Sequence, residues 1–137
     1  MSGADELIAR AKAAVRRRRL DEAAELYWRA LEAFEASGQP MRAAHIARHL
    51  AEVELEAGRL EEASLRIAAV LLFYRGRQVR RLEMANTLRI AALIDEKRGF
   101  RDEARQLWSE VREMYAREGV EEGVAEARKR LVRLANA

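Results

Sequence analysis

Two histidines and two glutamates are the residues of this sequence whose types and spacing could do chemistry. His45 and His49 lie four positions apart, and Glu52 and Glu56 continue at helical spacing. Side chains three or four positions apart on a helix share one face. Two imidazoles and a carboxylate on such a face could bind zinc, but the same spacing is typical of a solvated polar face. We predict the polar face, with no metal site and no cofactor.

Other catalytic patterns are missing from the sequence. It contains no cysteine, which excludes thiolate metal sites and cysteine nucleophiles. No serine has a recognisable base beside it, and each glycine is isolated rather than part of a phosphate-binding loop. We therefore expect a protein that is not an enzyme and that acts on no small-molecule substrate.

The charge distribution argues against nucleic-acid and membrane partners. The sequence has 26 basic and 23 acidic residues, and the two kinds are interspersed. Proteins that bind nucleic acids usually gather their basic side chains on one face. No apolar run approaches the roughly 20 residues that span a bilayer, and the first residues are acidic rather than basic, unlike a secretory signal. We expect a soluble, cytoplasmic protein.

The sequence contains an internal repeat with a period of about 40 residues. Ala23, Ala63 and Ala104 mark equivalent positions, and apolar or aromatic residues follow each of them at offsets of 4, 7 and 11. These offsets follow one face of a helix, so each repeat is predicted to be two helices joined by a tight turn. The expected helices span residues 4–17, 20–37, 40–57, 60–75, 80–98, 100–118 and 120–135.

The turn between the paired helices has a recurrent sequence. Gly58 and Gly99 stand at this turn in the second and third repeats, whereas Arg18 replaces the glycine in the first. An acidic residue followed by alanine then opens the next helix, as in Glu62-Ala63. Together with a small residue in each preceding helix, this pattern resembles the tetratricopeptide repeat (TPR) family, in a variant with a longer period.

The resemblance implies an all-α fold. We expect a right-handed superhelical array of three TPR-like helix–turn–helix repeats followed by a C-terminal capping helix. These elements would form one domain over residues 1–137, with repeats at about 4–38, 40–76 and 80–119 and the cap at 120–135. The common role of the family is to hold other proteins, so the resemblance also implies a protein partner.

The resemblance further implies a concave groove lined by the first helix of each repeat. The residues that map to this groove in the second and third repeats include His45, Arg48, His49, Glu52, Asn86 and Arg89. Some family members clamp the terminal carboxylate of a peptide with lysine and asparagine. Here Lys12, Glu52 and Leu93 occupy the asparagine positions, so that clamp is broken. Arg48 and Arg89 could still contact an acidic peptide, and a monomeric peptide-binding module is our alternative hypothesis.

The second helix of the middle repeat departs from its counterparts. Leu65, Ala69 and Leu72 stand where the other repeats have charged or polar residues, and Arg66 stands where they have leucine. An apolar stripe of this kind must be covered, either by extra core packing or by another chain. The predicted interface residues are Leu65, Ala68, Ala69, Leu72, Phe73, Ile90 and Leu93.

We predict a scaffold that associates through this apolar stripe, either with itself or with a second subunit. Most soluble oligomers are symmetric assemblies of a single chain, which makes self-association the simplest form of this hypothesis. A repeat scaffold with one apolar face is also what an engineered assembly component would look like.

Overall fold

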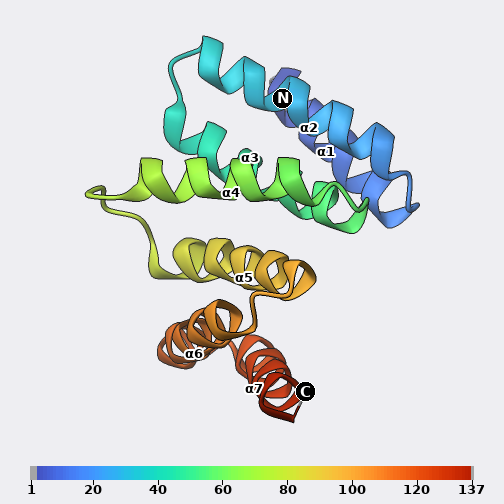
Figure 1. Ribbon diagram of the computed structural model, residues 1–137. Coiled ribbons are helices and arrows are strands. Elements are labelled where there is room, and N and C mark those ends of the chain that lie inside the picture. Colours follow the sequence, from blue (N-terminus) through green and yellow to red (C-terminus); the bar gives the residue numbers. More distant parts are fainter. Residues whose placement is uncertain (1–2, 137) are drawn as a thin grey trace. The chain divides into compact units, whose positions relative to one another are not determined.

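The computed structural model describes residues 3–136, and all regular structure in that range is α-helical (Figure 1). The helices are α1 (Gly3–Arg16), α2 (Leu20–Ala36), α3 (Pro40–Glu56), α4 (Leu60–Tyr74), α5 (Arg81–Arg98), α6 (Arg101–Arg117) and α7 (Glu121–Asn136). The predicted all-α fold is confirmed, and each helix end lies within one residue of its expected position. In the described range, no helix is long and apolar enough to cross a membrane.

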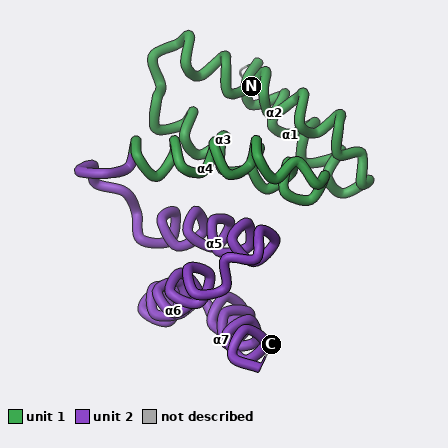
Figure 2. The backbone as a smooth tube through the Cα atoms, viewed as in Figure 1, with its two compact units in different colours: residues 1–73 green, residues 74–137 purple. Residues whose placement is uncertain are grey.

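The chain forms two compact units, residues 1–73 and residues 74–137, which Figure 2 distinguishes by colour. Within the first unit, α2 packs against both α1 and α3, and within the second unit, α6 packs against both α5 and α7. Helices α2 and α6 are therefore neighbours in space of the helices that precede and follow them in the sequence. This is the arrangement expected when each helix pair buries its apolar face against the next element.

The core of the first unit follows the repeat pattern. Small residues stand where helix backbones approach closely, and they are fully buried: Ala11, Ala23, Ala51 and Ala63. Larger buried side chains fill the space beside them, including Tyr27 of α2 and Ile67 of α4. The distance between two packed helices depends on the side chains at their contact, so these alanines allow the close pairing that the repeat requires.

The core of the second unit is built around two aromatic residues of α6. Trp108 is fully buried, and Tyr115 is buried beside it. The Tyr115 ring lies so close to α7 that a Cβ atom on Gly123 would come within 2.4 Å of it. The Tyr115 hydroxyl group donates a hydrogen bond of 2.7 Å to Oδ1 of Asn86 on α5. One tyrosine therefore contacts all three helices of this unit, and Gly123 makes that packing possible.

The three turns between paired helices share a residue in the left-handed conformation. The φ angle is +82° at Gly58, +81° at Gly99 and +59° at Arg18. The arginine in the first repeat therefore changes the side chain but not the turn. Its Nη1 atom lies 2.9 Å from Oε2 of Glu56 on α3. A left-handed residue with a Cβ atom costs roughly 1–2 kcal/mol, which glycine avoids.

We expect Gly58→Ala and Gly99→Ala each to lower the free energy of unfolding by about 1 kcal/mol. Apart from the adjacent residues, no atom would lie within 4 Å of a Cβ at either position, so the loss of stability reports the backbone conformation alone. Arg18→Gly should be neutral or stabilising, because an exposed ion pair contributes at most about 1 kcal/mol. Urea denaturation followed by circular dichroism measures all three variants. Unchanged stability in both alanine variants would contradict the left-handed turns.

Candidate functional site

Helix α4 is apolar on two opposite sides. Its buried side consists of Ala63, Ile67, Val70 and Tyr74. On the other side, Leu65 and Leu72 have 67% and 64% of their surface exposed. Ala68 and Ala69 are exposed there as well, and Phe73 is half-buried at the edge. Five of the seven predicted interface residues therefore lie on or beside the exposed side of α4.

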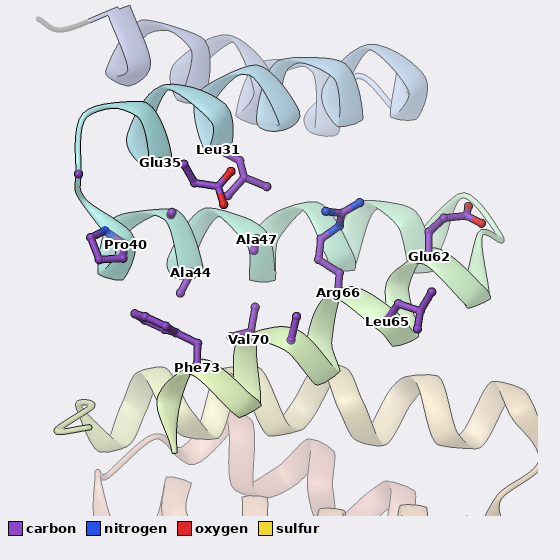
Figure 3. Close-up of a pocket in the computed structure, with 13 residues that line it drawn as sticks. Leu31, Glu35, Pro40, Ala44, Ala47, Glu62, Leu65, Arg66, Val70 and Phe73 are labelled. Carbon is purple, nitrogen blue, oxygen red and sulfur yellow. The ribbon is translucent and has the colours of Figure 1, made fainter. Parts of the chain in front are cut away.

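An apolar groove lies next to this exposed side, within the first unit (Figure 3). It has a volume of about 720 Å³ and is lined by residues of α2, α3 and α4. The apolar side chains that line it include Leu31 of α2, Ala44 and Ala47 of α3, and Leu65, Ala69 and Phe73 of α4. Because three of the four α3 residues that line it are alanines, short side chains leave this space open. We call it the α2–α4 groove.

Three charged residues also line the α2–α4 groove: Glu35 of α2, and Glu62 and Arg66 of α4. Both glutamates are exposed, and neither forms an ion pair within the part of the chain that the structure describes. Arg66, by contrast, forms an ion pair through Nε and Nη2 of its guanidinium group. The uncompensated charge at the edge of the groove is therefore negative.

The partner of Arg66 is a buried carboxylate on α3. Nε and Nη2 of Arg66 donate hydrogen bonds of 2.8 Å and 2.9 Å to the two carboxylate oxygens of Glu54. Glu54 is only 5% exposed. The guanidinium carbon of Arg66 also lies 5.4 Å from the centre of the Trp28 ring on α2. A bidentate pair of this kind is among the stronger polar contacts in proteins, and it holds α3, α4 and α2 together.

The repeat pattern explains why this ion pair occurs only in the middle repeat. The positions of Glu54 and Arg66 are occupied in the first repeat by Ala14 and Leu26, which are both buried. In the third repeat they are occupied by Asp95 and Leu107. Burial, and secondly the nearby Glu103 carboxylate, raises the pKa of Asp95. The charged form of Asp95 is therefore disfavoured there, although Arg98 acts in the opposite direction. The repeat pattern singled out Arg66 but not Glu54, although both positions depart from the first repeat together.

We expect Arg66→Leu to lower the free energy of unfolding by about 2 kcal/mol, because it leaves the Glu54 carboxylate buried without its partner. The double variant Glu54→Ala/Arg66→Leu restores the residues of the first repeat and should recover most of that loss. Urea denaturation of both variants and of Glu54→Ala completes a double-mutant cycle. If the stability losses of the two single variants simply add up to the loss of the double variant, the two residues are not a coupled pair.

The predicted groove residues of the second repeat pack among aromatic rings. The centroids of the His45 and His49 rings are 4.8 Å apart in an edge-to-face arrangement, and His49 stacks on Tyr27 at 5.6 Å. Burial, and secondly the Glu52 carboxylate, raises the pKa of Tyr27, while Arg48 acts in the opposite direction. Among the described residues, no group of three or more potential ligands is arranged to hold a metal ion.

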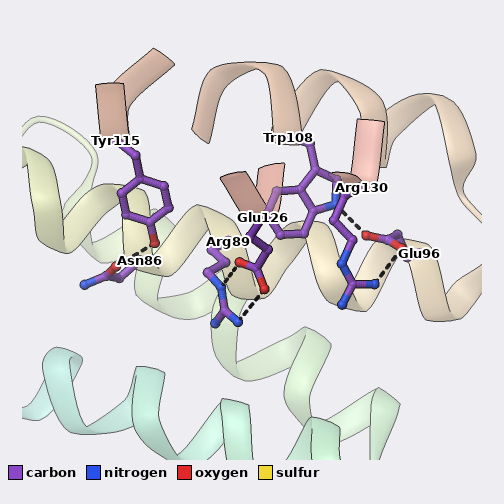
Figure 4. Close-up of polar contacts among 7 residues, drawn as sticks. All are labelled: Asn86, Arg89, Glu96, Trp108, Tyr115, Glu126 and Arg130. Atoms are coloured by element: carbon purple, nitrogen blue, oxygen red, sulfur yellow. Dashed lines mark hydrogen bonds and ion pairs between the residues drawn. The ribbon is translucent and has the colours of Figure 1, made fainter. Parts of the chain in front are cut away.

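The predicted groove residues of the second unit are engaged in contacts within that unit (Figure 4). Asn86 accepts the Tyr115 hydrogen bond, and Arg89 of α5 donates two hydrogen bonds, of 2.5 Å and 2.9 Å, to Glu126 of α7. These bonds lower the pKa of Glu126. A peptide that used Asn86 or Arg89 would compete with contacts that join the helices of this unit.

Polar contacts continue along the same three helices. Glu96 of α5 accepts a hydrogen bond from the indole nitrogen of Trp108 and another, of 3.2 Å, from Arg130 of α7. The two remaining predicted interface residues also lie in this unit. Ile90 is fully buried, and Leu93 packs against the core. They differ in this respect from Leu65 and Leu72, which are mostly exposed.

A family model described as soluble NSF attachment protein (SNAP) matches residues 2–122. The chain belongs to the soluble NSF attachment protein family. No curated protein and no solved structure matches the chain. The SNAP family is a TPR-like family of helical repeats and is of the non-enzymatic adaptor type. The expected helical-repeat class is therefore confirmed, and the SNAP family model ends close to the start of α7.

Proposed function

We propose that this SNAP-family chain is a non-enzymatic scaffold that associates with another protein chain, either a second copy or a different subunit, through the apolar exposed side of α4. Residues 1–137 would act as three repeats and a capping helix, as the sequence predicts. The observation that supports this proposal is the exposure of Leu65 and Leu72, two leucines of one helix that lie beside an apolar groove.

The exposed leucines supply a driving force for association. Complete burial of one leucine side chain is worth roughly 1.5–3 kcal/mol, and each of these two has about two thirds of its surface in water. Both leucines lie on the same side of the helix, so one partner helix can cover them together. The neighbouring alanines of α4 permit close approach of such a helix.

The alternative peptide groove on the first helices gains no comparable support. Asn86 and Arg89 already bind Tyr115 and Glu126 within the second unit. A peptide would have to replace those contacts, whereas a partner at α4 would bury side chains that are now in water.

We expect the purified chain, when no other partner is present, to self-associate with increasing concentration. Light scattering coupled to size exclusion should give a mass above the 15.7 kDa of one chain at high micromolar concentration. Leu65→Glu/Leu72→Glu should abolish the association, because each glutamate would have to be buried at the interface.

Val132→Glu is the control, because Val132 is an apolar residue of α7 that is 59% exposed. This variant should self-associate like the unmodified chain. A chain that stays monomeric at all concentrations would contradict self-association, and equal effects of the α4 and α7 substitutions would contradict the assignment to α4.

A further inference from the structure

We infer that the α2–α4 groove binds an amphipathic helix of a different protein, with leucine-like residues on its apolar face and lysine or arginine along its flanks. This inference rests on the proposed function and specifies the partner of the groove that shares Leu65 and Ala69 with the exposed side of α4. Three properties of the groove support it: its shape, its apolar lining and the sign of its uncompensated charge.

The shape of the groove suits a helix. Leu65, Ala69 and Phe73 follow one another at intervals of four residues along α4, which is the spacing of a ridge on a helix surface. Ala44 and Ala47 of α3 leave room beside this ridge. A partner helix with apolar residues at positions i, i+3 or i+4, and i+7 presents the matching ridge.

The charge at the edge of the groove favours a basic partner. Glu35 and Glu62 extend from different helices at separate places along the groove (Figure 3). Arg66 does not offset them, because its charge is already matched by Glu54. Exposed ion pairs contribute little to affinity, so the apolar contacts supply most of the binding. The two carboxylates act on selectivity by attracting basic flanks and repelling acidic ones.

The same charge argues against a second copy as the preferred occupant. Arg66 is the one basic residue of α4, and it is held by Glu54, whereas Glu61 and Glu62 are acidic. A second α4 would bring these two glutamates to an acidic groove, and Arg75, which directly follows the helix, offsets only one of them. This is why we assign the groove to a different chain and regard self-association as what occurs when that chain is absent.

Binding of three synthetic helical peptides to the full chain, measured by fluorescence anisotropy, tests the inference. The first peptide has leucines at i, i+3, i+4 and i+7 with lysine flanks, the second has the same leucines with glutamate flanks, and the third has lysine flanks with scrambled leucines. We expect the first to bind about tenfold more tightly than the second at low salt, with the advantage shrinking as ionic strength rises. The third should not bind measurably.

Charge reversal in the groove provides the decisive variant. Glu35→Lys/Glu62→Lys should reverse the preference, so that the glutamate-flanked peptide binds more tightly. The control variant Glu110→Lys/Glu122→Lys changes the net charge equally on exposed residues of the second unit. It also matches the position of Glu62, because Glu62 and Glu122 both lie in the first turn of a helix. This control should keep the original preference, and circular dichroism should show helical spectra for both variants.

The outcomes separate the inference from the proposed function. Equal binding of the lysine-flanked and glutamate-flanked peptides, or an unchanged preference after charge reversal, would overturn the inference and leave an apolar association surface in place. Equal binding of the scrambled peptide would overturn it as well, because charge alone would then explain the affinity. Failure of every peptide to bind the folded chain would overturn both the inference and a helix-binding role for α4.

Discussion

The ion pair between Glu54 and Arg66 is the interaction on which the unusual distribution of polar and apolar residues on α4 depends. In the first repeat, leucine occupies the inward position that Arg66 occupies in the middle repeat. An arginine can stand there only because α3 provides a buried carboxylate with two well-placed oxygens. Since the pair is neutral, it adds no net charge to the groove that Arg66 helps to line. The leucines Leu65 and Leu72 meanwhile occupy outward positions.

The two units use their polar residues differently. In the second unit, hydrogen bonds from Arg89, Tyr115, Trp108 and Arg130 all end on partners in α5 or α7. These contacts join the three helices to one another and engage these side chains in hydrogen bonds within the unit. In the first unit, the comparable bidentate pair includes Arg66, which lines an open apolar groove. The polar contacts thus join core helices in one unit and, in the other, hold the helices that line the α2–α4 groove.

The helices were predictable from sequence because the spacing of apolar residues recurs in each repeat and the turn glycine recurs in two of the three. Arg18, which replaces that glycine in the first repeat, keeps the same left-handed conformation as Gly58. The exposed side of α4 was also predictable, since Leu65 and Leu72 break the repeat. The groove itself was not, because it arises from the short alanines of α3 and the distance between α2 and α4. Gly123 was likewise missed, because its role depends on the Tyr115 ring, which no spacing rule places.

The most direct test of a helix-binding groove in the first unit is a methyl NMR titration of the chain with the lysine-flanked peptide. We expect saturable shifts of the methyl signals of Ala44, Ala47 and Leu65, which line the α2–α4 groove. The buried methyl groups of Ala104 and Ala127 in the second unit should not shift. Shifts confined to the second unit, or no shift at Leu65 at saturating peptide, would contradict the assignment of the binding surface to α4.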